Sequence, residues 1–237
     1  LDACEENKIL TEIRVVIKKI GKGAIKNTDR VSVFVEDNGP GIDFKYIPMV
    51  FGQYLASSKF GKGRCSRGQQ GIGISAATTW AMQTSARGVK VKSKVKNQKN
   101  SISCIVYTDL KGNKGVIKEK KIVAWDKEQG TSVDFLIDGR LQLKGEGGIL
   151  TYLRGNVLLN PHLTLHYDLP EMKPVSIARV TKEIPVVPES TAPHPHTMKL
   201  GEFISYLRSF GRVKLNEILK NNFSRLSDKM IAEILKK

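Results

Sequence analysis

The chain has 237 residues, 40% of them hydrophobic and 26% charged, which suits one large domain or one domain with a small appendage. No apolar stretch approaches the ~18 residues that span a bilayer. The 39 Lys and Arg outnumber the 23 Asp and Glu, and this net charge of +16 favours nucleic acid as a partner over a merely solvated basic surface.

Compartment and completeness follow from a few residues. The acidic start, Leu1 to Glu6, lacks Met and any secretory pattern, and it looks like the end of a helix, so we interpret the chain as an internal fragment. Three cysteines without metal-ligand spacing indicate free thiols in a reducing compartment. We therefore expect an intracellular protein, associated with the nucleoid in the cytoplasm or, in a eukaryote, nuclear. The sequence shows no basic amphipathic helix with Trp and Phe on one face, which is the pattern that would indicate a membrane surface.

Apolar alternation predicts strands at residues 12–20 and 30–36, joined by a loop. A turn at 37–41, a short helix from Asp43 to Val50 and a long loop at 52–67 follow. A helix rich in small residues is predicted at 71–84. Four strands then come in succession, at 90–95, 101–108, 114–124 and 131–137. A helix at 145–159 and a strand at 163–167 complete this part.

The last part of the chain has a different character. Six of the nine prolines fall between 170 and 195, which predicts a linker or an extended edge segment. Three basic amphipathic helices are predicted beyond it, at 200–207, 213–221 and 226–237. We expect an α+β fold, with helices on one face of a mixed sheet, because four successive strands fit a parallel βαβ sheet poorly. We place the domain boundary at residue 196, giving domains 1–196 and 197–237.

Asp37, Gly39 and Gly41 stand at the predicted end of a strand. A buried carboxylate is a pure hydrogen-bond acceptor, so it can accept from the N6 amine of adenine, and glycines allow the backbone close to a flat base. The alternative is a turn that only ends a strand. Thr131, at the start of another predicted strand, is a candidate for the same site.

Glycines 68, 71 and 73 lead into the predicted helix at 71–84. Successive free backbone N–H groups and the positive end of a helix can bind phosphate. The segment matches neither the Gly-Lys-Ser/Thr phosphate loop nor the Gly-x-Gly-x-x-Gly dinucleotide pattern. Each glycine motif is weak evidence alone, but an adenine site followed by a phosphate site predicts a nucleotide-binding domain.

In this order, the motifs Asp37-Asn38-Gly39-Pro40-Gly41, Gly68–Gly73 and Gly130-Thr131 resemble the Bergerat ATP-binding fold of the GHKL superfamily. The chain is similar in more detail to the B-subunit family of topoisomerase VI, a type IIB DNA topoisomerase. Leu1 to Glu5 resembles the end of the family's first motif. Ser57 to Gly61 and Ser66 to Ala77 resemble its lid and phosphate loop. Residues 203–235 resemble its helix–two-turns–helix insert.

The resemblance implies specific roles. Asp37 would bind adenine together with Gly39, Gly41 and Thr131, and Ser58 and Lys59 would lie on the lid. The residues that would surround the phosphates are Gly68, Gln69, Gln70, Gly71, Ile72, Gly73, Ile74 and Ser75. The family's general-base Glu and Mg²⁺-binding Asn belong just before Leu1, so we expect no catalytic residue and no metal ligand within the chain.

The function that the resemblance implies is ATP binding and hydrolysis in a type II topoisomerase. ATP and Mg²⁺ would be the cofactors. ATP-driven dimerisation would be coupled to DNA strand passage that relaxes or decatenates duplex DNA. The partners would be duplex DNA and a DNA-cleaving A-subunit, in a heterotetramer overall. The alternatives are another GHKL ATPase, of mismatch-repair or chaperone type, and a degenerate DNA-binding module that does not hydrolyse ATP.

Two basic stretches are candidates for contact with DNA. Residues 90–121 hold ten lysines and two acidic residues, for which a solvated sheet face is the favoured alternative. The helical tail carries Arg208, Arg212, Lys214, Lys220, Arg225, Lys229, Lys236 and Lys237. For the tail, DNA binding and a packing insert are equally supported.

Overall fold

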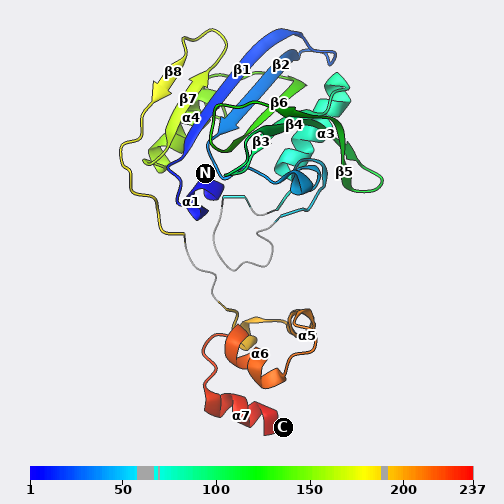
Figure 1. Ribbon diagram of the computed structural model, residues 1–237, viewed down its shortest axis with the longest axis vertical. Coiled ribbons are helices and arrows are strands. Elements are labelled where there is room, and N and C mark those ends of the chain that lie inside the picture. The colour runs from blue at the N-terminus through cyan, green and yellow to red at the C-terminus, as the bar shows by residue number, and fades with distance from the viewer. Residues whose placement is uncertain (58–66, 69, 188–191, 237) are drawn as a thin grey trace. The chain divides into compact units, whose positions relative to one another are not determined.

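The computed structural model describes residues 1–57, 67–68, 70–187 and 192–236 (Figure 1). The described residues form two compact units, which divide between residues 187 and 192. The first unit contains one sheet and its covering helices, and the second contains short helices. Among the described residues, no helix is long and apolar enough to cross a membrane.

The first unit contains strands and helices in alternating groups. Its strands are β1 (Glu12–Lys22), β2 (Asp29–Asp37), β3 (Val89–Lys94), β4 (Ser101–Asp109), β5 (Lys114–Val123), β6 (Gly130–Gly139), β7 (Thr164–Asp168) and β8 (Val175–Ile177). Its helices are α1 (Asp2–Glu6), the 3₁₀ turn η1 (Phe44–Tyr46), α2 (Ile47–Gly52), α3 (Gly73–Ser85) and α4 (Ile149–Leu159).

The strands form one mixed sheet in the order β5-β4-β3-β6-β2-β1-β7-β8. The β1–β7 pair is parallel, and the other pairs are antiparallel. A row of directly paired residues, Val15, Val35, Val133, Val91 and Cys104, crosses five strands. All five belong to the apolar cores, so both cores of this unit lie on one sheet face. The predicted α+β class with helices on one face of a mixed sheet is confirmed.

Most predicted elements appear within one or two residues of their expected ends. The helix predicted at 145–159 begins later, at Ile149, because Gly145 and Gly147 have left-handed backbone angles, φ +87° and +76°. The proline-rich segment contains the short strand β8 at the edge of the sheet, which agrees with the extended-edge alternative. The prediction of a cap at Asp43 is also confirmed, since its carboxylate accepts from the N–H of Lys45.

The second unit contains the 3₁₀ turn η2 (Pro195–Thr197), α5 (Leu200–Ser209), α6 (Leu215–Asn222) and α7 (Asp228–Lys236). Ile218, Leu219, Phe223 and Ile231 form its buried core. The Ser224 N–H donates to the Pro193 carbonyl at 3.0 Å. Residues 193–196, which the sequence places in the first domain, are therefore tied to this unit. Three amphipathic helices are present as predicted, and their assignment as a helix–two-turns–helix module stays a prediction.

Candidate functional site

Three polar residues lie side by side where β2, β6 and β3 meet one edge of the sheet. Asp37 ends β2 and pairs directly with Thr131 on β6, and Thr131 pairs with Ser93 on β3. Each lies two residues along its strand from Val35, Val133 or Val91, which is one full strand repeat, so all three lie on the helix-covered face. The sequence predicted Asp37 and Thr131 for one site, and the register of β2 and β6 makes them neighbours.

The Asp37 carboxylate is held as an acceptor at the end of β2. Its Oδ1 accepts a 2.7 Å hydrogen bond from the N–H of Gly39. Burial raises the pKa of this carboxyl above its usual range, and hydrogen bonds from the backbone of Gly39 and Thr131 oppose the rise. A carboxylate with few water contacts gains most from a ligand that brings its own N–H donor. Asp37 therefore suits recognition of an exocyclic amine.

Ser93 is a further candidate for this site that the sequence did not predict. Its hydroxyl accepts from the Ile42 N–H at 2.7 Å and lies 3.5 Å from the Thr131 hydroxyl. It thereby joins the turn after β2 to the middle of the sheet. The signal was available, because Ser93 continues the buried alternation of Val89 and Val91, and a hydroxyl on a core face needs partners.

Asn38 has a structural role beside Asp37. Its side-chain oxygen accepts from the Glu12 N–H at 2.8 Å, and its amide donates to the Leu10 carbonyl at 2.9 Å. These bonds hold the start of β1 against the end of β2. Cys4 on α1 is also close, since a Cβ on Gly39 would lie 3.3 Å from its sulfur. Cys4 and Cys104 are buried free thiols, in line with the predicted reduced state.

The glycines of the two motifs serve different purposes. Gly41 has φ +75°, and a Cβ there would lie 2.2 Å from the Lys94 carbonyl oxygen. Gly71 has φ +63° and the same kind of conflict with the backbone of Ala56. The fold alone requires these two glycines. In contrast, a Cβ on Gly73 meets nothing within 4 Å among the described residues, so Gly73 keeps its backbone open for a ligand.

Helix α3 begins at Gly73, and the side chain of its N-cap residue, Ile72, makes no capping hydrogen bond with the described residues. The Ser75 hydroxyl donates to the Gln53 carbonyl at 2.7 Å, and Ile74 packs against an apolar core. Hence Ser75 and Ile74 can offer a phosphate only their backbone N–H groups. An uncapped helix N-terminus favours an anion electrostatically. The predicted residues Ser58, Lys59 and Gln69 lie outside the described residues.

A cavity of about 600 Å³ lies beside this site, between α4 and the strands β1 and β7. Its lining is mostly apolar and includes Ile13, Val15, Leu153 and Leu165, with Asp2 and Arg67 at its polar side. Asp37 and Thr131 do not line it. The cavity therefore adjoins the predicted nucleotide site without containing its polar row.

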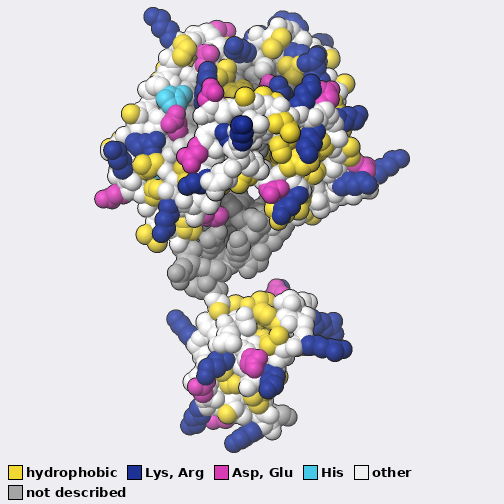
Figure 2. All heavy atoms as spheres, in the orientation of Figure 1, with side chains coloured by type: hydrophobic (Ala, Val, Ile, Leu, Met, Phe, Trp, Pro, Cys, Tyr) yellow, Lys and Arg dark blue, Asp and Glu magenta, His cyan; other side chains and the backbone are white. Residues whose placement is uncertain are grey.

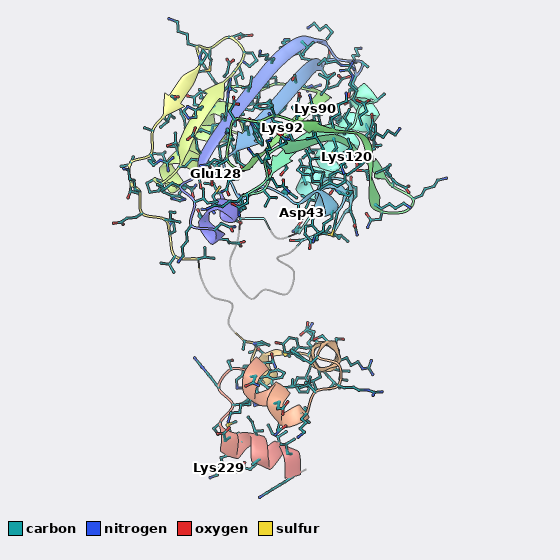
Figure 3. The ribbon with its side chains drawn as sticks, viewed as in Figure 1. Asp43, Lys90, Lys92, Lys120, Glu128 and Lys229 are labelled. Atoms are coloured by element: carbon teal, nitrogen blue, oxygen red, sulfur yellow. The ribbon has the colours of Figure 1, made fainter. Side chains whose placement is uncertain are left out.

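The lysines of residues 90–121 lie in different environments. Lys90 and Lys92 alternate with buried valines, so they lie on the sheet face opposite the helices (Figure 3). The Lys92 ammonium lies 4.2 Å from the ring centre of Trp125. Lys94 is buried and donates to the carbonyls of Trp125 and Lys127, which leaves it unsuited to contact DNA. Figure 2 shows Lys and Arg spread over the face in view rather than gathered in one patch.

Comparison with family models gives no match. Among curated proteins, the chain is 37% identical over all 237 residues to the B-subunit of the type 2 DNA topoisomerase 6 of Archaeoglobus fulgidus. It is 34% identical over 237 residues to the protein of the same name from Pyrococcus abyssi. The chain covers 38% and 41% of these two relatives, so it spans about two fifths of their length.

Solved structures show a weaker likeness. The ATP-binding domain of topoisomerase IV from Francisella tularensis aligns with a TM-score of 0.46 and 16% identity, over 75% of this chain and 46% of that one. The 43K ATPase domain of gyrase B from Thermus thermophilus aligns with a TM-score of 0.38 and 19% identity, over 70% of this chain and 40% of that one.

Proposed function

Because the chain is homologous over its full length to part of the B-subunit of type 2 DNA topoisomerase 6, we propose that it is the ATP-binding part of such a protein. The carrying observation is the row of Asp37, Thr131 and Ser93 on the helix-covered face. Asp37 accepts the adenine amine, and the hydroxyls of Thr131 and Ser93 lie within reach of the same base edge. The predicted roles of these residues are part of this proposal.

The phosphates bind at the other half of the site, on the backbone of Gly68, Gln70 and Gly71 and at the start of α3. Gly73 and Ile74 contribute N–H groups at the positive end of that helix. ATP would bind together with Mg²⁺, and the hydrolysis of ATP would drive the protein through its reaction cycle. The described residues bring together no group of three or more His, Cys, Asp or Glu side chains suited to a metal. In this proposal the chain contacts the adenine base and the phosphate oxygens, and the Asn that the family resemblance implies coordinates Mg²⁺.

In the whole protein, ATP binding drives two copies together and couples this closure to passage of one DNA duplex through another. A DNA-cleaving A-subunit completes a heterotetramer. The excess of Lys and Arg favours association with duplex DNA through its phosphates. Both basic stretches stay candidates for this contact, except that Lys94 is buried and Lys92 covers Trp125. An intracellular location follows from DNA as the substrate.

ATP-driven relaxation of supercoiled DNA tests the proposal. The measurement uses the full-length protein that carries this chain, together with its DNA-cleaving partner, and compares Gly73→Ala with Gly155→Ala. Outside its own helix, a Cβ at either glycine meets no described atom within 4 Å, so neither alanine forces the surrounding fold to shift. We expect Gly73→Ala to lose most ATP-dependent relaxation, because the added methyl group occupies the place of a phosphate, and Gly155→Ala to retain it.

Two outcomes contradict the proposal. Relaxation that is equally fast without ATP would remove the nucleotide from the mechanism, and equal activity in the two variants would remove Gly73 from the phosphate site. DNA binding without any nucleotide affinity would support the degenerate module instead. An ATPase that repairs mismatches or refolds proteins but does not relax DNA would support another GHKL function.

A further inference from the structure

The start of the glycine-rich loop is anchored by a side-chain cluster that joins two of the motif segments to the region between α4 and β7. The Arg67 guanidinium donates to Glu5 through two bonds of 2.8 and 2.9 Å, to the Asn160 side-chain oxygen at 2.6 Å, and to Asp2. The Arg67 backbone N–H also donates to Asp2, at 3.1 Å. His162 completes the cluster with a 2.9 Å contact to Glu5. These five residues are called the Arg67 cluster below.

The Arg67 cluster joins three separate parts of the first unit. Asp2 and Glu5 are three residues apart, so they project from one side of α1. Asn160 follows α4, and His162 precedes β7. A planar guanidinium that binds two carboxylates and an amide fixes the distances to these groups and also their orientation. A flexible ammonium fixes only the distances. The start of the loop is thus held against α1 and against the connection between α4 and β7.

The contacts of the Arg67 cluster are charge-assisted hydrogen bonds, and some of its side chains are buried. The side chains of Glu5 and His162 are only 9% and 1% exposed, so the Glu5 carboxylate and the His162 Nε2 depend on protein partners rather than water. The hydrogen bond from Arg67 holds the pKa of Glu5 below its usual range, so Glu5 stays ionised as Arg67 requires. Four guanidinium bonds are made within the cluster, which commits the side chain to anchoring rather than to a ligand.

Helix α1 contacts both halves of the proposed nucleotide site. Cys4 lies beside Gly39, next to the Asp37 carboxylate. Asp2 and Glu5, on the same short helix, hold Arg67, which directly precedes Gly68. The distance between the adenine half and the phosphate half is therefore set through one rigid turn of helix.

We propose that Arg67 is a positioning residue of the nucleotide site, which fixes the phosphate-binding loop at the correct distance from the adenine-binding residues. The inference rests on the proposed ATP function. Arg67 contacts neither base nor phosphate in this role. Its loss leaves adenine recognition intact and weakens only the part of the affinity that the triphosphate contributes.

Isothermal titration of adenosine and of the β,γ-imido analogue of ATP separates the affinity for the adenine base from the affinity that the triphosphate contributes. In Arg67→Ala, we expect the affinity for the ATP analogue to fall about tenfold, within the range typical of coupled sites, and the affinity for adenosine to stay within about twofold of wild type. Arg67→Lys should not restore the loss, because one ammonium cannot replace the bidentate contacts.

Arg30→Ala is the matched control. Arg30 forms the same kind of pair, 2.9 Å from the carboxylate of the fully buried Asp138, away from the glycine loop. We expect its loss to lower the melting temperature without changing the ratio of the two affinities. If Arg67→Ala also lowers the melting temperature and leaves that ratio unchanged, Arg67 is only structural and the inference is overturned. Wild type that binds neither ligand would instead contradict the proposed ATP function.

Discussion

Asp37→Asn is expected to stabilise the fold while it weakens nucleotide binding. Because burial raises the pKa of Asp37, the folded state binds the proton more tightly than the unfolded state. This contribution to stability is complete below the ordinary carboxyl pKa and is lost as pH rises through the folded value. The neutral amide of Asn has the same shape and does not ionise, so the variant avoids this loss of stability. At pH 7 the melting temperature should therefore rise, by roughly 2–4 °C for each kcal/mol gained.

The same substitution reverses the hydrogen-bonding character of the site. The Gly39 N–H fixes the acceptor oxygen of residue 37, so the NH₂ group of the introduced amide takes the other position, where it opposes the N6 donor of adenine. Affinity for ATP should fall about 10- to 100-fold, as expected when a donor is left unpaired. Thermal unfolding and titration on the same sample measure both effects. An unchanged affinity, or a melting temperature that falls at pH 7 and not at pH 3, would contradict this account of Asp37.

Leu219→Asp is expected to unfold the second unit and leave the first folded. Leu219 is 2% exposed in a core of only four buried residues. Replacement of buried leucine by alanine already costs about 2–5 kcal/mol, and a buried unpaired charge costs more. A helical unit of this size has little stability to spare. Loss of the dispersed NMR signals of residues 192–236, with those of the sheet retained, would be the expected result.

Leu215→Asp on the same helix is the control. Leu215 is 44% exposed and begins α6, where an acidic side chain favours the helix. It should leave both units folded. If Leu219→Asp shifted signals throughout the sheet, the two units would not fold independently.

The strands were predictable because their alternation is local. Val31, Val33 and Val35 or Val89 and Val91 show the buried face within a few residues. The late start of α4 was harder to predict from the sequence, because it depends on the backbone angles of Gly145 and Gly147 rather than on apolar spacing. Strand β8 has only three residues and needs β7 as its partner to be recognised.

The candidate site divides in the same way. Asp37 and Thr131 carry a turn signal and a family resemblance, and strand register then makes them neighbours. Asp2, Glu5 and Arg67 lie in segments that resemble family motifs, but the sequence does not show that their side chains meet. The contacts of the Arg67 cluster join residues 62 to 157 positions apart in the sequence. Only the folded arrangement shows that they surround one guanidinium.

Base selectivity tests the central claim most directly, because Asp37 can accept from the amine of adenine but must repel the carbonyl oxygen of guanine. The measurement is titration of the wild-type protein with the β,γ-imido analogues of ATP and GTP under identical conditions. We predict a preference for the ATP analogue on the order of 100-fold, which corresponds to the cost of about 3 kcal/mol for a buried polar group left unpaired. Equal affinity for the two analogues, or no affinity for the ATP analogue, would contradict the assignment of an ATP site at Asp37.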